Sequence, residues 1–150
     1  MNRLYFTLII AVAACGKDVT APTLVAGTYS VFMVDARQIP IVTPQDSSCV
    51  AVNSGGWLSL DGRGGYSMIL DRVTTVCNGI AQGTALVSQI GTYEQTRDSL
   101  LVFHPTPPRG PAFIAAYDPG SFQPGLGGRL PNLIFDFVGH HYWLIEDALP

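Results

Sequence analysis

The chain has 150 residues, a formal net charge of −3 at pH 7 and charged side chains at only 13% of its positions. This length suits a single domain with a sizeable core. The few lysines and arginines are scattered along the chain, which excludes the clustered basic surface of a nucleic-acid binder. Its 16 glycines and 11 prolines interrupt the sequence every few residues, so long helices are not expected.

The amino terminus has the pattern of an exported protein. Asn2 and Arg3 give it a short positive start, and an apolar run from Leu4 to Ala14 follows. This run is too short to cross a bilayer as a helix, which takes roughly 20 residues. We therefore interpret residues 1–14 as a secretory signal peptide.

The end of the apolar run resembles the lipobox of bacterial lipoproteins. It consists of the small residues Val12, Ala13 and Ala14 followed by Cys15. The resemblance implies that Cys15 receives diacylglycerol and becomes the first residue of the mature protein, which stays anchored in a membrane by two or three acyl chains. In such lipoproteins an aspartate after the cysteine favours the inner membrane. Gly16 stands there instead, which implies the outer membrane.

The alternative to lipidation is an ordinary signal peptide with a chance cysteine. If the resemblance holds, residues 15–24 form a lipidated amino terminus and a short polar tether that contains Pro22,. Residues 25–150 then form one domain. The predicted location is the bacterial cell envelope.

The stretch LSLDGRGGYSMIL, residues 58–70, predicts a β-hairpin. Its turn is Gly62-Arg63-Gly64, where glycine permits positive φ angles,. Counting outward from Arg63 gives two pairs on an apolar face: Leu60 with Tyr66, and Leu58 with Met68.

The same register predicts a disulfide. Cys49 and Cys77 each lie fourteen residues from Arg63 and therefore face each other. Thiols outside the cytoplasm usually pair, and on the entropic model a bridge here contributes roughly 3 to 4 kcal/mol. Gly55-Gly56 introduces the alternative of a bulge that slips the register. A reactive or metal-binding thiol pair is the rival interpretation.

Other segments rich in β-branched and aromatic residues are expected to be strands, and Gly/Pro-rich segments between them to be loops. The expected strands are residues 25–35, 85–95, 99–104 and 112–118. The expected loops are residues 105–111 and a long irregular connection at 119–131 that covers an opening.

A last hairpin is expected near the carboxyl terminus. With Gly139-His140 as its turn, two pairs form an aromatic and aliphatic face: Phe137 with Tyr142, and Phe135 with Leu144. The opposite face carries Asp136, His141 and Trp143, a mixed set typical of partial exposure or of a lining role.

About eight strands joined by short links predict an all-β fold, an antiparallel up-and-down meander that closes into a small barrel. The first strand contains Gly27-Thr28-Tyr29. In an exported lipoprotein with such a meander, this motif resembles the lipocalin-like lipoproteins. The resemblance covers most of residues 25–147. It implies an up-and-down barrel and an apolar ligand.

Two non-catalytic functions follow. In the first, the protein binds a small apolar ligand in the barrel, although eight-stranded barrels can also fill solid with side chains. The residues expected to line a cavity, or else to be core, are Leu58, Leu60, Tyr66, Met68, Phe135, Phe137, Tyr142 and Leu144. In the second, it is an envelope interaction module or inhibitor that acts through loops 105–111 and 119–131.

Catalysis is not indicated by the sequence. There is no G-x-S-x-G elbow, no H-E-x-x-H motif and no phosphate-binding loop,, so we expect neither an enzyme nor a cofactor. If both lie on a strand, adjacent His140 and His141 point to opposite sides and are poor partners for one metal, whereas in a turn they could converge. Convergence of His104, His141 and Asp136 in one cleft would revive a catalytic interpretation.

Overall fold

The computed structural model describes residues 24–97, 99–107, 110–123 and 128–147. The predicted signal peptide, Cys15 and the tether up to residue 23 lie outside this part. The described part contains no helix long and apolar enough to span a membrane. Its strands are β1 (Ala26–Val34), β2 (Arg37–Gln38), β3 (Ile41–Pro44), β4 (Cys49–Asn53), β5 (Trp57–Asp61), β6 (Gly65–Cys77), β7 (Ile80–Arg97), β8 (Leu100–Pro105), β9 (Phe113–Gln123), β10 (Gly128–Phe137) and β11 (His140–Glu146).

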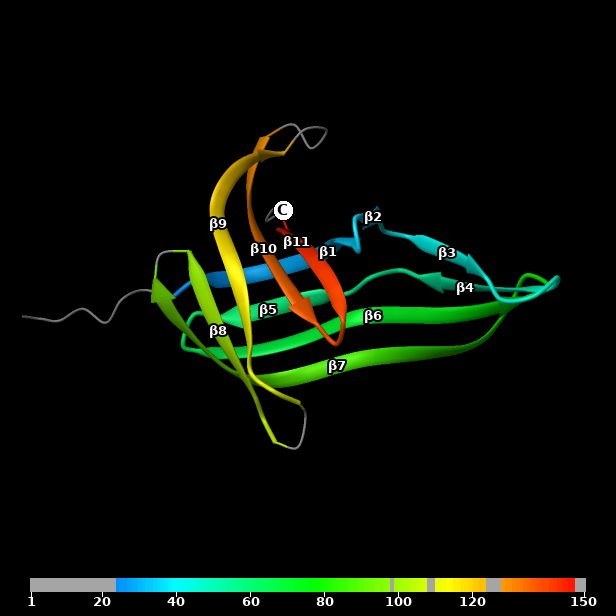
Figure 1. Ribbon diagram of the computed structural model, residues 1–150, viewed down its shortest axis with the longest axis horizontal. Coiled ribbons are helices and arrows are strands. Elements are labelled where there is room, and N and C mark those ends of the chain that lie inside the picture. Colours follow the sequence, from blue (N-terminus) through cyan, green and yellow to red (C-terminus); the bar gives the residue numbers. More distant parts are fainter. Residues whose placement is uncertain (1–23, 98, 108–109, 124–127, 148–150) are drawn as a thin grey trace, which may run out of the picture.

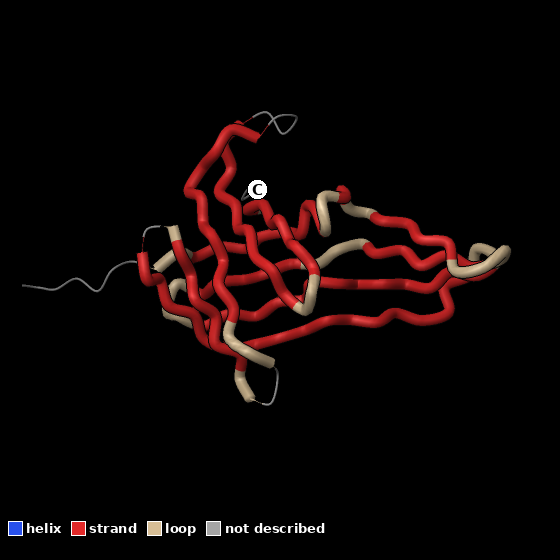
Figure 2. The backbone as a smooth tube through the Cα atoms, viewed as in Figure 1, coloured by secondary structure: helices blue, strands red, loops and turns tan. Residues whose placement is uncertain are grey.

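Eight of these strands close an antiparallel barrel (Figure 1). Each strand from β5 to β11 pairs with the next in the chain, and β1 closes the ring by pairing with both β11 and β5. The tube in Figure 2 is strand and loop throughout its described length. This confirms the predicted all-β meander, and the barrel is compatible with a lipocalin-like fold.

The barrel interior consists of alternate side chains from each strand, as the two-residue period of a strand requires. All eight residues predicted to face inward are buried. The aromatic rings among the core residues contact one another: Phe103 and Phe113 stack with centroids 4.7 Å apart, and Phe135 lies 5.2 Å from Phe113 and 5.6 Å from Tyr142. A chain of rings therefore crosses the interior.

Beyond the barrel, β6 and β7 continue as a second region that we call the arm (Figure 1). The arm is a single sheet in the order β3-β4-β6-β7, and it includes residues 71–77 of β6 and 80–88 of β7. The predicted outer ends of the first hairpin thus leave the barrel instead of continuing its wall.

The predicted register of the first hairpin is confirmed. Leu60 pairs with Tyr66, Leu58 pairs with Met68, and Cys49 lies opposite Cys77 at the far end of the arm, where the two form a disulfide. Gly55-Gly56 does interrupt the strand but does not slip this register.

A compensating bulge explains why the register survives. On β6 the even-numbered Met68 and Leu70 face the barrel core, whereas the odd-numbered Asp71 and Val73 face the same side in the arm. The pairing of β6 with β7 shifts between residues 69 and 72, which is the mark of a bulge. It lies opposite residues 54–56, because the Arg72 backbone bonds to both Ser54 and Gly55.

The predicted register of the last hairpin is wrong by two residues. The turn is Val138-Gly139, so Phe137 pairs with His140 and Phe135 pairs with Tyr142. Both turn residues have positive φ, 51° and 81°, the pattern of a type I′ turn in which glycine suits the second position. A shift of two residues leaves every side chain on its predicted face.

The predicted irregular connection at residues 119–131 is also wrong. β9 extends to Gln123 and β10 starts at Gly128, and the two strands pair; residues 124–127 lie outside the described part. Pro119 and Pro131 lie where the register shifts between Leu130 and Asn132. Proline has no backbone N–H to donate to a neighbouring strand. It is tolerated at such an irregularity because the regular ladder of hydrogen bonds is already interrupted there.

Candidate functional site

The eight residues predicted to line a ligand cavity are, in the structure, packed core residues. Phe137 is the most exposed of them at 8%. The Tyr66 hydroxyl lies 3.1 Å from Oε1 of Gln89 and donates a hydrogen bond to it, and burial raises the pKa of Tyr66 to about 12. A ligand inside the barrel would have to displace rings that contact one another.

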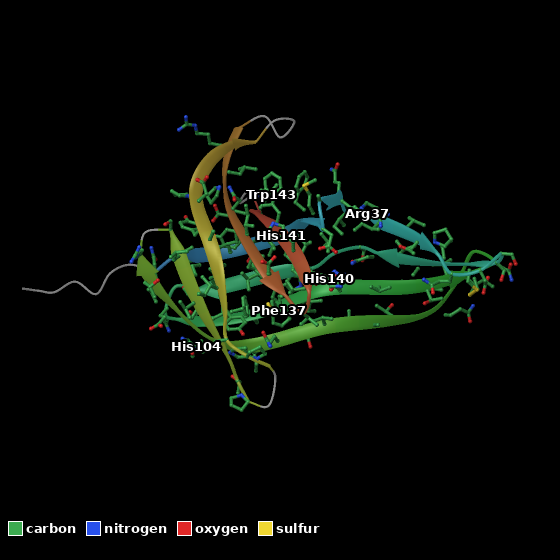
Figure 3. All side chains as sticks on the ribbon, in the orientation of Figure 1. Arg37, His104, Phe137, His140, His141 and Trp143 are labelled. Carbon is green, nitrogen blue, oxygen red and sulfur yellow. A yellow bond between two sulfur atoms is a disulfide. The ribbon has the colours of Figure 1, made fainter. Side chains whose placement is uncertain are left out.

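A cleft of about 430 Å³ lies between the arm and the adjoining end of the barrel, and we call it the arm cleft. Its position between the barrel strands and the arm can be followed in Figure 3, where Arg37 and His140 are labelled. Its walls are mainly apolar. The barrel contributes Val34, Asp35, Arg37 and His140, and the arm contributes Ile41, Thr43, Gln45, Ala51, Asn53, Asp71, Val73 and Val87.

Asp71 lies where β6 leaves the barrel. The bulge turns its carboxylate toward the barrel interior, where the buried Tyr142 hydroxyl donates a hydrogen bond to Oδ2. The side-chain amide of Asn53 donates to Oδ1 at 2.8 Å. Burial and then the Asp71 carboxylate raise the pKa of Tyr142, so this hydroxyl keeps its proton and remains a donor. Asp71 therefore joins the barrel core to the arm cleft.

A second carboxylate, Asp35, stands in the turn between β1 and β2. The backbone N–H of His141 donates to its Oδ1 at 2.9 Å, and Nδ1 of His140 lies 2.7 Å from its Oδ2. These two bonds, the backbone one first, hold the pKa of Asp35 below its usual value, while Asp35 raises the pKa of His140. Asp35 and His140 thus form a pair at the rim of the arm cleft.

The remaining charge at the arm cleft is Arg37 on β2. Its side chain is exposed and makes no ion pair with any carboxylate of the described residues. Water therefore solvates the guanidinium, and Arg37 adds a positive charge to the rim without closing the cleft.

A neighbouring cleft of about 510 Å³ opens at the mouth of the barrel. Phe113 and Phe137 reach it from the core, Gly110 and Pro111 border it from the predicted loop 105–111, and Ala112 follows them. Val87 of β7 borders both clefts. Both clefts therefore lie at the end of the barrel that carries the arm.

The three residues named as a possible catalytic group do not form one. His141 lies 2.7 Å from Asp136 on the last hairpin, whereas His104 lies on β8, 3.4 Å from Glu94. Figure 3 shows His104 well apart from His141. No group of three or more His, Cys, Asp or Glu side chains that could hold a metal occurs within the described ranges.

The arm cleft and its polar residues Asp35, Arg37, Asn53 and Asp71 were not among the predicted site residues. One signal was present: residues 73–93 contain no Asp, Glu, Lys or Arg, which is unusual for a strand pair with two exposed faces. No protein-family model, curated protein or solved structure matches this chain. The geometry described above is therefore the basis for assigning a function.

Proposed function

We propose that this protein is a non-catalytic lipoprotein of the bacterial cell envelope that binds a small apolar ligand in the arm cleft. The observation that carries the proposal is the arm cleft itself. It places the apolar side chains of Val34, Ile41, Ala51, Val73 and Val87 around one space of about 430 Å³, within the range of about 300–1,000 Å³ that is usual for small-molecule sites.

Covering this surface favours ligand binding because apolar area removed from water contributes roughly 25 cal/mol per Å². Inside the barrel the equivalent surfaces already cover one another through ring contacts. Among the described residues the arm is a single sheet with no second layer on it, so the inner faces of Ala51 and Val73 remain available. A ligand in the arm cleft supplies the missing layer.

The position at which the described chain begins is compatible with a lipid anchor at Cys15. Leu24 lies beside Gly64 in the turn between β5 and β6, at the end of the barrel opposite the arm. If the chain is anchored from that end, as we propose, the arm cleft would face away from the membrane and toward a ligand in the aqueous compartment.

The test compares a bulky substitution that fills the arm cleft with the same substitution on the opposite face of the same strand. Ala51 faces the cleft, while Val52 is the next residue on β4 and faces the opposite side of the sheet,. We expect native mass spectrometry of protein purified from its own envelope to show a retained apolar mass that Ala51→Trp removes and Val52→Trp keeps. Clean apo protein, or a ligand that survives Ala51→Trp, would refute the assignment.

The envelope location is tested separately. We expect the intact mass of the mature chain to begin at Cys15 with its acyl chains, and Cys15→Ser to release the protein from the membrane fraction. A soluble, unacylated wild-type chain would contradict the lipoprotein proposal without affecting the arm cleft.

A second candidate function is an envelope protein–protein interaction module. The stretch 73–93 contains no charged residue, and much of it lies in the arm. The contact surface of such a module would therefore be the arm and not the Gly/Pro-rich loops. Residues 83–88 of β7 form an outer edge with no further strand beside them among the described residues, and such an edge accepts a strand from a partner protein. We expect Leu86→Lys to abolish in-cell crosslinking to that partner and Thr92→Lys, on the part of β7 that β8 covers, to preserve it.

A further inference from the structure

We infer that the ligand of the arm cleft is a small organic cation, an apolar body with one protonated amine that binds against Asp71. This inference rests on the proposed function and adds the chemical class of the ligand. It follows from the charges around the arm cleft, which are not equivalent in their burial or in their partners.

Asp71 is a charged group held only by neutral donors. Its two described partners are the Tyr142 hydroxyl and the Asn53 amide, and no Lys, Arg or His of the described residues forms an ion pair with it. The residue is partly buried among the apolar walls of the arm cleft. A carboxylate in such surroundings is stabilised by a cation, and each of its oxygens can accept more than one hydrogen bond.

The cations at the arm cleft have other surroundings. His140 bonds to Asp35 at 2.7 Å, and the Asp71 carboxylate is the smallest of the causes that raise its pKa; Arg37 is exposed. Above the pKa of His140, the two carboxylates and Arg37 leave one net negative charge on the cleft walls. An anionic ligand would therefore approach two carboxylates, whereas an ammonium group would complement Asp71.

The shape of the arm cleft favours one charged group on an apolar body. Asp71 lies where β6 leaves the barrel. Val34, Val73 and Val87 line the same cleft with apolar surface, and Thr43, Gln45 and Asn53 add uncharged polar groups to it. A metal ion would require more ligands than this cleft provides, since no suitable group of three occurs in the described part of the chain. A single ammonium group needs only the carboxylate and its neighbours.

The experiment compares three probes with the same aromatic body: 1-naphthylmethylamine, 1-naphthalenemethanol and 1-naphthoate. Each is titrated against the full lipidated chain in nanodiscs, at a pH where the amine is protonated. We expect the amine to bind at least about tenfold more tightly than the alcohol, and the carboxylate more weakly than the alcohol.

The variants locate the preference. Asp71→Asn is expected to reduce amine affinity about tenfold and to leave alcohol affinity unchanged; Asp147→Asn, which removes an exposed carboxylate at the other end of the barrel, is expected to change neither. Because Asp71 also bonds to a core tyrosine, a second variant avoids that contact. Thr43→Lys, on β3 in the arm cleft, is expected to weaken amine binding and to strengthen carboxylate binding.

The outcomes separate the two proposals. Equal binding of amine and alcohol, with both lost in Ala51→Trp, overturns the cation and leaves the ligand site in place. Tighter binding of the carboxylate, or an amine preference that survives both Asp71→Asn and Thr43→Lys, also overturns it. Binding of all three probes that survives Ala51→Trp overturns the ligand site as well.

Discussion

The barrel and the arm share two strands but are stabilised in different ways. Along β6, buried and partly exposed side chains alternate from Gly65 to Leu70, and from Asp71 onward none is fully buried. Along β7 the order is reversed, with an almost fully exposed stretch from Ile80 followed by alternation within the barrel. One strand can thus belong to a core at one end and to an open sheet at the other.

The difference shows that the two regions are stabilised by different kinds of residues. The barrel strands supply large apolar residues at every second position and bury them together, so hydrophobic burial dominates. The arm supplies Val, Thr and Ala on both faces and is held by backbone pairing, by the disulfide at its tip and by the polar contacts of Asp71 at its base. Four experiments test this contrast, in order of expected effect.

The largest effect is expected from removing a ring from the barrel core. Phe103 is fully buried and contacts the rings of Tyr66, Tyr93 and Phe113. Phe103→Ala should reduce the free energy of unfolding by about 3–5 kcal/mol, because it removes a buried side chain and leaves a cavity. Urea denaturation followed by tryptophan fluorescence measures this loss.

The matched control lies in the arm. Val42 is half exposed on β3, and Val42→Ala should change the unfolding free energy by no more than about 0.5 kcal/mol. Similar losses from the two substitutions would mean that the arm has a core of its own, and the contrast between the regions would be wrong.

The second effect concerns the disulfide. Replacing both cysteines by serine removes a cross-link between residues 28 positions apart, for which the entropic model gives roughly 3–4 kcal/mol. Since Cys49 and Cys77 lie at the tip of the arm, we expect amide protons of β4 and of residues 71–77 to lose protection while β10 and β11 keep theirs. Hydrogen exchange with mass detection resolves the two regions; equal loss in both would show that the arm and barrel unfold as one unit.

The disulfide was predictable from the sequence because, once the turn of a hairpin is known, the number of residues from the turn determines which residues pair. Arg63 marks the turn, and each step outward fixes one pair. The count reaches Cys49 and Cys77 correctly because the interruption at Gly55-Gly56 is matched by the bulge at Leu70 and Asp71. The same reasoning identified the buried faces of both hairpins, since alternation survives a register error of two residues.

The arm cleft was not predictable because it depends on where strands leave the barrel. Alternation in the sequence says which residues share a face, but not whether that face meets a core or water. Asp71 follows Leu70 directly and would be expected on the opposite face; the bulge places both on the inner side. The positive φ of Val138 was likewise unexpected, because β-branched residues rarely adopt it.

A third, smaller effect tests the junction between the two regions. A Cβ atom on Gly56 would lie 1.7 Å from the carbonyl oxygen of Ile69, a contact that the backbone must move to relieve. Gly56→Ala should therefore cost about 1–3 kcal/mol, as overpacking does. Its control is Gly83→Ala in the arm, where a Cβ meets nothing within 4 Å and no loss is expected. Thermal unfolding of both variants compares them, and a neutral Gly56→Ala would show that the junction is not closely packed.

The smallest effect is expected at the rim of the arm cleft, where the Asp35–His140 pair joins two turns of the barrel. The raised pKa of His140 stabilises the fold fully below the unfolded value of 6.5, and this contribution is lost as pH rises through the folded value,. The lowered pKa of Asp35 stabilises the fold above 3.8, and this contribution is lost as pH falls through the folded value,. The pair therefore contributes most between about pH 4 and pH 6.5.

Melting temperatures of His140→Gln, Asp35→Asn and the double variant, measured across this range, isolate the pair from the other bond that Asp35 accepts. We expect a coupling between the two residues that is present at pH 5 and declines above pH 7. A coupling that is constant with pH would show that the bond does not depend on a charged imidazole. In that case the contact would be a hydrogen bond from a neutral imidazole to the Asp35 carboxylate, and the pair would contribute no pH dependence to the stability of the fold.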